Sequence, residues 1–166
     1  MTTIYYGECI LDTQRYYLAT TVNGLCFVGS PNQPLIEIEH FLPVNQLVLD
    51  QARLAPFVTA IQTYWTGQTT NWSVPIDLIG GTDLQHQVWT ALQTIPYGQT
   101  RDYSQITQQI GRPTAIRAVA SAIGRNPLLL LIPCHRVLRK GGTLGGYRGG
   151  LALKQQLLKL EQNPHH

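Results

Sequence analysis

The segment LLIPCHRVLRKGG, residues 130–142, places a thiol, an imidazole and a guanidinium at consecutive positions, Cys134, His135 and Arg136. A cysteine becomes a strong nucleophile only as the thiolate, which a neighbouring base or cation favours. The three residue types therefore suit nucleophilic chemistry at sulfur. Adjacent side chains in a strand point to opposite faces. His135 can serve as the base only if the chain turns here or if a water bridges the pair.

A metal site is a second chemistry that cysteine and histidine allow. Zinc sites use paired ligands such as Cys-x2-Cys, with a second pair downstream. Cys9 and Cys26 belong to no such pair, and we expect both to be buried structural thiols. A weaker zinc hypothesis would gather Cys9, Cys26 and either His40 or His86. We expect no bound metal.

Composition predicts a globular protein without a membrane span. The chain has 166 residues, 43% hydrophobic and 13% charged, which suits one ordinary domain or two small lobes. The N-terminal sequence MTTIYYGECILDTQRYY lacks the basic and apolar regions of a signal peptide, and no apolar run is long enough to cross a bilayer. The odd number of cysteines, three, indicates reduced thiols. We therefore expect a cytoplasmic protein with no membrane partner.

Charge is distributed unevenly along the chain. The net charge is +3, but residues 1–83 carry −5 and residues 84–166 carry +8. A basic half beside an acidic half indicates that one lobe meets a polyanion such as nucleic acid. A solvated surface with segregated charges is the alternative.

The first lobe is predicted to combine strands with one helix. Extended segments at 16–22 and 25–28 flank Asn23-Gly24, which favours a hairpin with a type I′ turn and positive φ at both turn residues. A helix is expected over about 48–65, closed by Gly67.

A proline, a further strand and a linker complete the prediction for the first lobe. Pro56 is expected to break or kink the helix. Alternation predicts another strand at Trp72, Val74, Ile76 and Leu78. Gly80-Gly81 suggests a linker, which divides the chain into an α/β lobe over 1–81 and a second domain over 82–166.

The second domain is predicted to be mostly helical. Apolar residues recur at helical spacing from about Asp83. Asp102 can cap another helix, with Gln105 completing a capping box. The tight turn at 111–113 ends in a proline that suits the first position of a helix over about 114–124. Two short helices joined by a three-residue turn containing glycine indicate a helix-turn-helix.

The second of these two helices has a distinctive outer face. Ile116, Val119 and Ile123 are expected to face inward. The outer face is expected to carry Thr114, Arg117, Ala118 and Ser121. Small side chains permit a close approach to a nucleic-acid groove, and a single arginine can probe between bases. The alternative is that Arg117 is only a solubilising surface residue.

The residues around the thiol predict a sheltered but reachable site. The apolar run 128–132 is expected to be a buried strand that ends at Pro133, with Cys134 at its mouth. The stretch GGTLGGYRGG, residues 141–150, lacks the ending of a phosphate-binding loop and is expected to be a flexible loop. It carries Tyr147 and Arg148 and precedes a helix over 151–161.

These segments together resemble a known family. IPCHRV (132–137), RAVASAIGRNP (117–127) and GGYRGGLALKQQLLKLE (145–161) resemble the O6-alkylguanine-DNA alkyltransferases, or methylated-DNA–protein-cysteine methyltransferases. The resemblance is dense from about Leu84 to Glu161. The first lobe resembles the family only in its general makeup of strands and a helix.

The resemblance implies a suicidal DNA-repair reaction. Cys134 would accept the alkyl group from O6-alkylguanine, and from O4-alkylthymine, in double-stranded DNA. His135 would act through a water as the base that helps form the thiolate, and Glu161 would orient His135. The resulting thioether has no ordinary route back, so the resemblance implies a single turnover, no cofactor and a monomeric protein.

The family resemblance also implies that several residues bind the substrate base or shape its pocket. Asn126 would hold the turn before the active site, and Tyr147 would hydrogen-bond the flipped base and donate toward the departing purine. Val137 and Lys154 occupy pocket-lining positions. Arg148 is larger than the small residue of some members, which bears on the tolerance of bulky alkyl groups.

The implied contacts with DNA centre on the helix-turn-helix, which in this family enters the minor groove. Arg117 would fill the gap left by the flipped nucleotide, and Tyr103 would press on the target's phosphate. The DNA-binding set expected here is Arg117, Tyr103, Thr114, Ala118, Ser121 and Arg136.

Two other functions compete with this interpretation. A cysteine hydrolase could use Cys134, His135 and Glu161, although in such enzymes the histidine normally comes from elsewhere in the chain. A DNA-binding regulator built on the helix-turn-helix would need no acceptor cysteine.

The sequence departs from the family pattern at Leu84, where the family often has phenylalanine. We expect this change to affect only packing.

Overall fold

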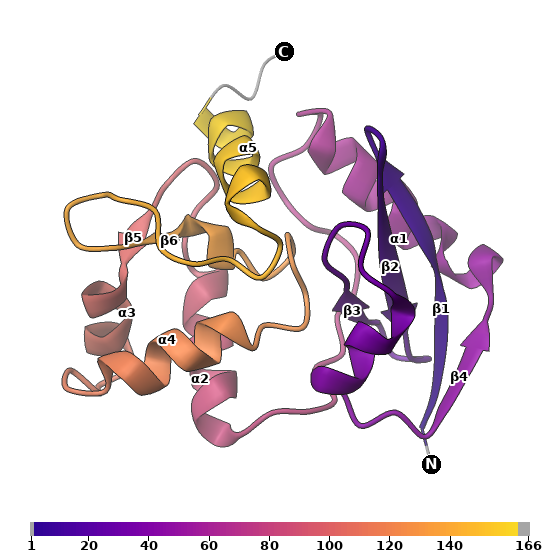
Figure 1. Ribbon diagram of the computed structural model, residues 1–166, viewed down its shortest axis with the longest axis horizontal. Helices are drawn as coiled ribbons and strands as arrows, with labels where there is room; N and C mark the ends of the chain where they lie inside the picture. Colours follow the sequence, from indigo (N-terminus) through magenta and orange to yellow (C-terminus); the bar gives the residue numbers. More distant parts are fainter. Residues whose placement is uncertain (1, 163–166) are drawn as a thin grey trace. The chain divides into compact units, whose positions relative to one another are not determined.

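The computed structural model describes residues 2–162, which form two units (Figure 1). Residues 2–80 and the short segment Pro127–Leu129 make the first unit. Residues 81–126 and 130–162 make the second. The first unit holds a small sheet with a helix and the second is mostly helical, which confirms the predicted α/β class. None of the described helices is long and apolar enough to cross a membrane.

A four-stranded sheet organises the first unit. Its strands are β1 (Thr3–Leu11), β2 (Gln14–Thr20), β3 (Leu25–Val28) and β4 (Gln46–Leu49). Their order is β3-β2-β1-β4, with β1–β2 and β2–β3 antiparallel and β1–β4 parallel. The helix α1 (Gln51–Trp65) lies along the sheet and contacts β1 and β2 (Figure 1). A short 3₁₀ helix, η1 (Leu35–His40), buries Ile38 in an apolar core that includes the strand residues Ile4 and Phe27.

The loop between β2 and β3 differs from the predicted type I′ turn. β2 ends at Thr20, two residues earlier than expected. Neither Asn23 nor Gly24 has a positive φ. Thr21 instead closes a four-residue loop, because its backbone N–H donates to Gly24 O at 3.0 Å and its hydroxyl accepts from Asn23 N at 3.0 Å. The side-chain bonds of Thr21 therefore replace the turn geometry that Asn-Gly favours.

Helix α1 begins at Gln51, later than predicted, because the preceding residues pair with β1 as strand β4. Asp50 caps it through a carboxylate that accepts a first-turn backbone N–H. Pro56 lies inside the helix without ending it. Gly67 has a φ of 77° and closes the helix as predicted.

The strand predicted around residues 72–78 is wrong. Only Ile76 forms an isolated bridge, with Leu25. Pro75 has no N–H to donate to a ladder of strand hydrogen bonds. The segment makes two backbone hydrogen bonds with Leu25: the Pro75 carbonyl accepts from Leu25 N, and Asp77 N donates to Leu25 O. On the same strand Val28 N donates to Pro127 O at 2.9 Å. Two short pieces of distant chain thus cover β3 in place of one regular strand.

The second unit consists of four helices and a minimal sheet. The α-helices are α2 (Asp83–Gln93), α3 (Tyr103–Gln109), α4 (Ile116–Gly124) and α5 (Leu151–Gln162). The sheet pairs β5 (Arg101–Asp102) with β6 (Val137–Leu138), and the 3₁₀ helix η2 (Cys134–Arg136) directly precedes β6. Asp102 and Gln105 form the predicted capping box at the start of α3. A second capping box, formed by Thr82 and Gln85, starts α2. Helices α2 and α5 match their predicted positions.

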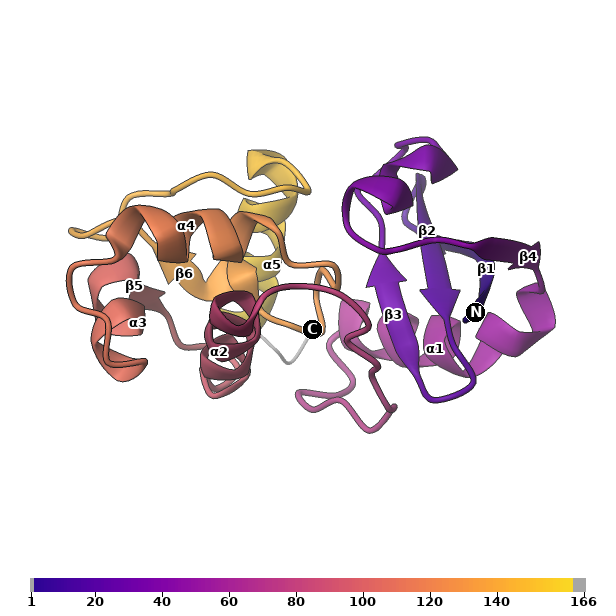
Figure 2. The same cartoon turned by 90° about the horizontal axis from the view of Figure 1, so that it is seen from below.

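Helices α3 and α4 pack against each other as a helix-turn-helix (Figure 2). The connection is longer than three residues, and α4 begins at Ile116. Pro113 does not start the helix, because Ala115 N donates to Arg112 O at 3.0 Å and places the proline in a turn. Val119 is buried as predicted, but Ile116 is 47% exposed and does not face inward.

The predicted buried strand at 128–132 is a buried turn. All five side chains are buried, but Leu130 has a φ of 75°, which an extended strand excludes. Asn126 Nδ2 donates to Ile132 O at 2.8 Å and ties the two ends of the turn together. A left-handed leucine costs about 1–3 kcal/mol and persists only where its surroundings impose it. Here the burial of the turn and the Asn126 bond impose it.

We predict that two glycine substitutions separate conformational strain from steric contact. Gly98 and Gly111 have φ values of 80° and 74°. A Cβ at Gly98 would lie 3.1 Å from Glu161 O, whereas at Gly111 it would meet nothing within 4 Å. Gly111→Ala should lower the free energy of unfolding by about 1–2 kcal/mol, and Gly98→Ala should lower it further. Urea denaturation measures both values, and equal losses would contradict the contact with Glu161.

Candidate active site

The Cys134 segment is held in place by a tight turn and a strand pair. Cys134 N donates to Ile132 O at 2.7 Å, and Arg136 N donates to Pro133 O at 3.0 Å. Strand β6 follows directly and pairs with β5, which leads into α3. The chain therefore turns at the cysteine, which is one of the two conditions under which His135 can serve as its base. The strand pair also links the cysteine to the helix-turn-helix.

Asn126 connects the buried turn to the thiol. Its Nδ2 donates to Cys134 Sγ at 3.2 Å as well as to Ile132 O at 2.8 Å. Its backbone carbonyl accepts a hydrogen bond of 2.9 Å from Arg148 Nη2. Asn126 is 1% exposed and Cys134 is 5% exposed. The one asparagine therefore holds both the turn and the sulfur, in agreement with the turn-holding role that the resemblance implies.

Cys134 opens onto a pocket of about 390 Å³. Its lining residues are Tyr103, Ala120, Ile123, Gly124, Cys134, Gly146, Tyr147 and Arg148. The pocket thus brings together four residues that the sequence singled out from three distant segments. Sequence reasoning missed Ala120 and Gly124, although their spacing places both on the same face of α4 as Ile123.

A buried carboxylate organises the residues that follow the cysteine. Glu161 Oε2 lies 2.8 Å from His135 Nε2. The Arg136 guanidinium binds both carboxylate oxygens, with Nε–Oε1 at 2.7 Å and Nη2–Oε2 at 2.9 Å. Arg136 Nη1 also donates to Ile95 O at 2.7 Å. Arg136 is 6% exposed, so the structure places it in this network and not on a DNA-facing surface.

His135 is held as a neutral base. Burial lowers its pKa, and the nearby positive charges of Arg136 and Lys154 lower it further, against the opposing effect of Glu161. Because the carboxylate accepts from Nε2, the Nδ1 atom lacks a proton. Nδ1 is buried and has no hydrogen-bond partner among residues 2–162. It is therefore free to accept a proton.

The Cys134 thiol is protonated at rest. Burial raises its pKa, while the Asn126 hydrogen bond and the charges of Arg148 and Lys154 oppose that rise. Nucleophilic chemistry at this sulfur therefore requires a base to remove the proton. The neighbouring neutral imidazole is chemically suited to that task.

Lys154 and Val137 lie behind the pocket and not among its lining residues. Lys154 Nζ donates to Val137 O at 2.8 Å and to the carbonyls of Gly145 and Gly146 at 3.4 Å each. The lysine is fully buried, and burial lowers its pKa. It anchors the loop that carries Tyr147, so its contribution to the pocket is indirect.

The outer face of the helix-turn-helix is open to solvent. Thr114, Arg117, Ala118 and Ser121 are all exposed. A second pocket, of about 400 Å³, shares part of its lining with the first. It is lined by Tyr103, Ser104, Ile116, Ala120, Arg139, Lys140 and Gly146. Sequence reasoning missed Arg139 and Lys140, for which the run of positive charge after Arg136 was the available signal.

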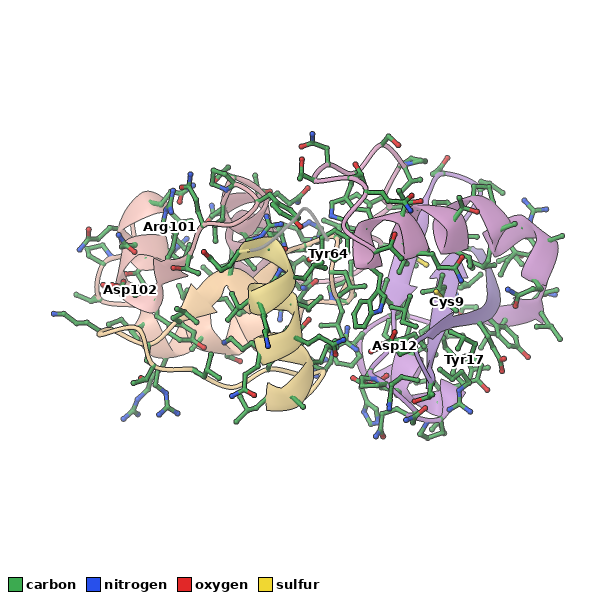
Figure 3. The ribbon with its side chains drawn as sticks, turned by 90° about the horizontal axis from the view of Figure 1, so that it is seen from above. Cys9, Asp12, Tyr17, Tyr64, Arg101 and Asp102 are labelled. Atoms are coloured by element: carbon green, nitrogen blue, oxygen red, sulfur yellow. The ribbon has the colours of Figure 1, made fainter. Side chains whose placement is uncertain are left out.

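The other two cysteines are buried thiols in the first unit, as predicted. Cys9 is 1% exposed and lies within the sheet, where Figure 3 labels it, and Cys26 is 0% exposed. Burial raises the pKa of Cys9 to about 11 and that of Cys26 to about 12, so neither is reactive. Within residues 2–162 no three histidine, cysteine or acidic side chains group together as metal ligands. The hypothesis that His40 or His86 completes a zinc site therefore has no structural support.

The structure thus places a buried thiol against a pocket in the unit that contains the helix-turn-helix. A family model described as the 6-O-methylguanine DNA methyltransferase DNA-binding domain matches residues 83–163. The chain is 44% identical over 164 residues to the inducible methylated-DNA–protein-cysteine methyltransferase of Bacillus subtilis, covering 96% of this chain and 91% of that protein. The chain belongs to the methylated-DNA–protein-cysteine methyltransferase family and is an alkyltransferase of that class.

Further relatives and solved structures agree with this assignment. The bifunctional transcriptional activator and DNA repair enzyme Ada of Escherichia coli is 40% identical over 159 residues, covering 94% of this chain and 45% of that protein. The crystal structure of Mycobacterium tuberculosis OGT in complex with DNA matches with a TM-score of 0.82 and 35% identity, covering 98% of this chain and 94% of that one. Both the fold and the family therefore extend over both units of the chain.

We predict that His135 makes folding stability sensitive to acid. Its pKa is lowered in the folded state from an ordinary value of 6.5, so below that pH the unfolded chain binds a proton that the folded chain does not. The free energy of unfolding should therefore fall as the pH drops from about 6.5, with a slope of up to about 1.4 kcal/mol per pH unit. Urea denaturation between about pH 7 and pH 5 measures the slope.

The control for this prediction is a pair of asparagine variants. His135→Asn should remove this part of the slope, whereas the exposed-site variant His40→Asn should keep it. If His135→Asn does not fold, His135→Gln provides the same comparison. An unchanged slope in the His135 variant would show that this residue is not the acid-sensitive group.

Proposed function

We propose that Cys134 takes the alkyl group from O6-alkylguanine, and from O4-alkylthymine, in double-stranded DNA. The observation that carries this proposal is a buried, protonated thiol that opens onto a pocket of about 390 Å³ beside a neutral imidazole. Tyr147 and Tyr103 line the same pocket and supply an aromatic surface for a base. Family membership supports the chemistry at sulfur.

The proposed reaction is a displacement at the alkyl carbon. His135 Nδ1 accepts the Cys134 proton through a bridging water, and Glu161 stabilises the imidazolium that forms. The thiolate attacks the carbon attached to O6, a C–S bond forms, and the C–O bond breaks with its electron pair going to the base. The His135 imidazolium returns its proton to water, and the base takes up one proton from water at N1 and becomes guanine. The thioether is stable, so each molecule reacts once.

The proposed route to the base is flipping from the minor groove. O6 cannot be reached inside a stacked duplex, and extruding the nucleotide costs about a few kcal/mol. The exposed face of α4 carries small side chains around Arg117, which suits close approach to the groove and insertion of one long side chain into the stack. Thr114, Ala118 and Ser121 would contact the groove, and Tyr103 would contact the phosphate of the target.

We propose further that the protein acts as a cytoplasmic monomer and uses no cofactor. Cys134 and the other two cysteines are free thiols, which suits a reducing compartment. The residues proposed for catalysis and for binding the base all come from residues 103–161 of a single chain.

Mass spectrometry after reaction with duplex DNA that contains O6-methylguanine tests the proposal. We expect a mass increase of one methyl group, mapped to Cys134, and no reaction with a second portion of DNA. Cys134→Ala should bind the DNA but acquire no methyl group. Unmodified wild-type protein that binds the lesion would indicate a damage sensor, and turnover of an ester would indicate a hydrolase.

We predict that Arg117→Ala slows transfer from duplex DNA much more than transfer from free O6-benzylguanine. Only the duplex reaction requires flipping, so its rate should fall about tenfold or more, which corresponds to about 1.4 kcal/mol. Lys159→Ala removes a charge from an exposed site on α5 and should leave the ratio of the two rates unchanged. Equal slowing of both reactions by Arg117→Ala would contradict its role in flipping.

A further inference from the structure

Arg148 occupies an unusual position beside the acceptor cysteine. It lines the pocket next to Cys134, and its Nη2 atom donates to the backbone carbonyl of Asn126 at 2.9 Å. Asn126 in turn donates to Cys134 Sγ at 3.2 Å and to Ile132 O at 2.8 Å. The guanidinium therefore holds the backbone of Asn126, and the Asn126 side-chain amide holds the sulfur, so one residue links the loop before α5 to Cys134.

The charges that face the sulfur come from several elements. Arg148 and Lys154 are the cations that favour the Cys134 thiolate, from the loop before α5 and from α5 itself. Tyr103 faces it from α3, where burial and, to a smaller extent, a negative sulfur raise the pKa of that phenol. The neutral His135 follows on the same short helix. Lys154 is engaged with three backbone carbonyls behind the pocket, whereas Arg148 lies on the pocket wall.

We propose that Arg148 is a positioning residue for alkyl transfer, which stabilises the Cys134 thiolate by its charge and by holding the backbone of Asn126. Its guanidinium holds the backbone carbonyl of Asn126, which fixes the backbone position from which the side-chain Nδ2 donor reaches Sγ. Its positive charge also lies on the wall of the same pocket as the sulfur, where an opposite charge favours the thiolate directly. The negative sulfur gains more from this arrangement than the neutral thiol does. The inference concerns the reactivity of the sulfur and rests on the proposed role of Cys134 as acceptor.

The test is the pH profile of Cys134 alkylation by iodoacetamide, which is small enough to enter the pocket and needs no DNA. Quenched samples are digested, and the labelled Cys134 peptide is quantified apart from those of Cys9 and Cys26. Arg148→Gln keeps an amide donor but removes the charge. We expect it to move the midpoint of the profile upward by about one pH unit, the low end of the effect of a nearby opposite charge.

Two further variants make the result specific. Arg148→Lys keeps the charge and should lie between wild type and Arg148→Gln, because an ammonium cannot reproduce the planar guanidinium. Lys159→Gln makes the same change in net charge on the exposed surface of α5 and should leave the midpoint where it is. A purely structural role for Arg148 would lower the rate at every pH without moving the midpoint. That result, or an equal shift in Lys159→Gln, would overturn the proposal.

A parallel assay of wild-type protein with O6-methylguanine DNA separates this inference from the proposed function. Methyl transfer to wild-type Cys134, together with an unmoved midpoint in Arg148→Gln, would refute the role of Arg148 alone. Absence of methyl transfer by the wild type would refute the proposed function, whatever the alkylation profile shows.

Discussion

The Glu161 carboxylate is the group on which the organisation of the active site depends. It is buried, and it accepts hydrogen bonds from His135 and from two nitrogens of Arg136. A buried charge is tolerated only when it is paired and hydrogen-bonded. Arg136 supplies the pairing, so the carboxylate stays charged in the interior. That charge determines the tautomer of His135, because Nε2 must donate to it.

The consequences extend from this carboxylate to the nucleophile. With its proton on Nε2, the imidazole presents a bare Nδ1 atom in a buried site. Burial keeps both partners of the proton transfer neutral at rest, since it raises the pKa of Cys134 and lowers that of His135. A permanently charged thiolate would be exposed to oxidation and to unspecific alkylation. A neutral thiol that is followed by a neutral imidazole limits this reactivity.

The scaffold around this centre explains why a left-handed leucine and a buried lysine are retained. Leu130 permits the turn that places Cys134 at the pocket, and Asn126 bonds to both the turn and the sulfur. The Lys154 ammonium donates three hydrogen bonds to backbone carbonyls of β6 and of the loop before α5. Each feature carries a cost in strain or desolvation, and each fixes a segment that contacts the pocket.

The amino-acid sequence by itself determined the candidate nucleophile, the capping box at the start of α3 and the division of charge. Local signals sufficed for these, since capping boxes and helical periodicity act over a few residues. Local signals failed at Asn23-Gly24, at residues 72–78 and at 128–132. There, bonds from Thr21, Pro75 and Asn126 to nearby or distant backbone replaced regular turns and strands.

Only the tertiary structure decided the roles of the charged residues near the cysteine. Arg136 comes directly after His135, and the sequence alone allowed it to face DNA. In the structure its guanidinium is buried against Glu161, which lies 25 residues further along the chain. Arg148 likewise reaches Asn126 across 22 residues. A long flexible side chain can point to many partners, and no short-range pattern selects among them. Burial selects the partner, because a charge removed from water must find its counterpart in the folded chain.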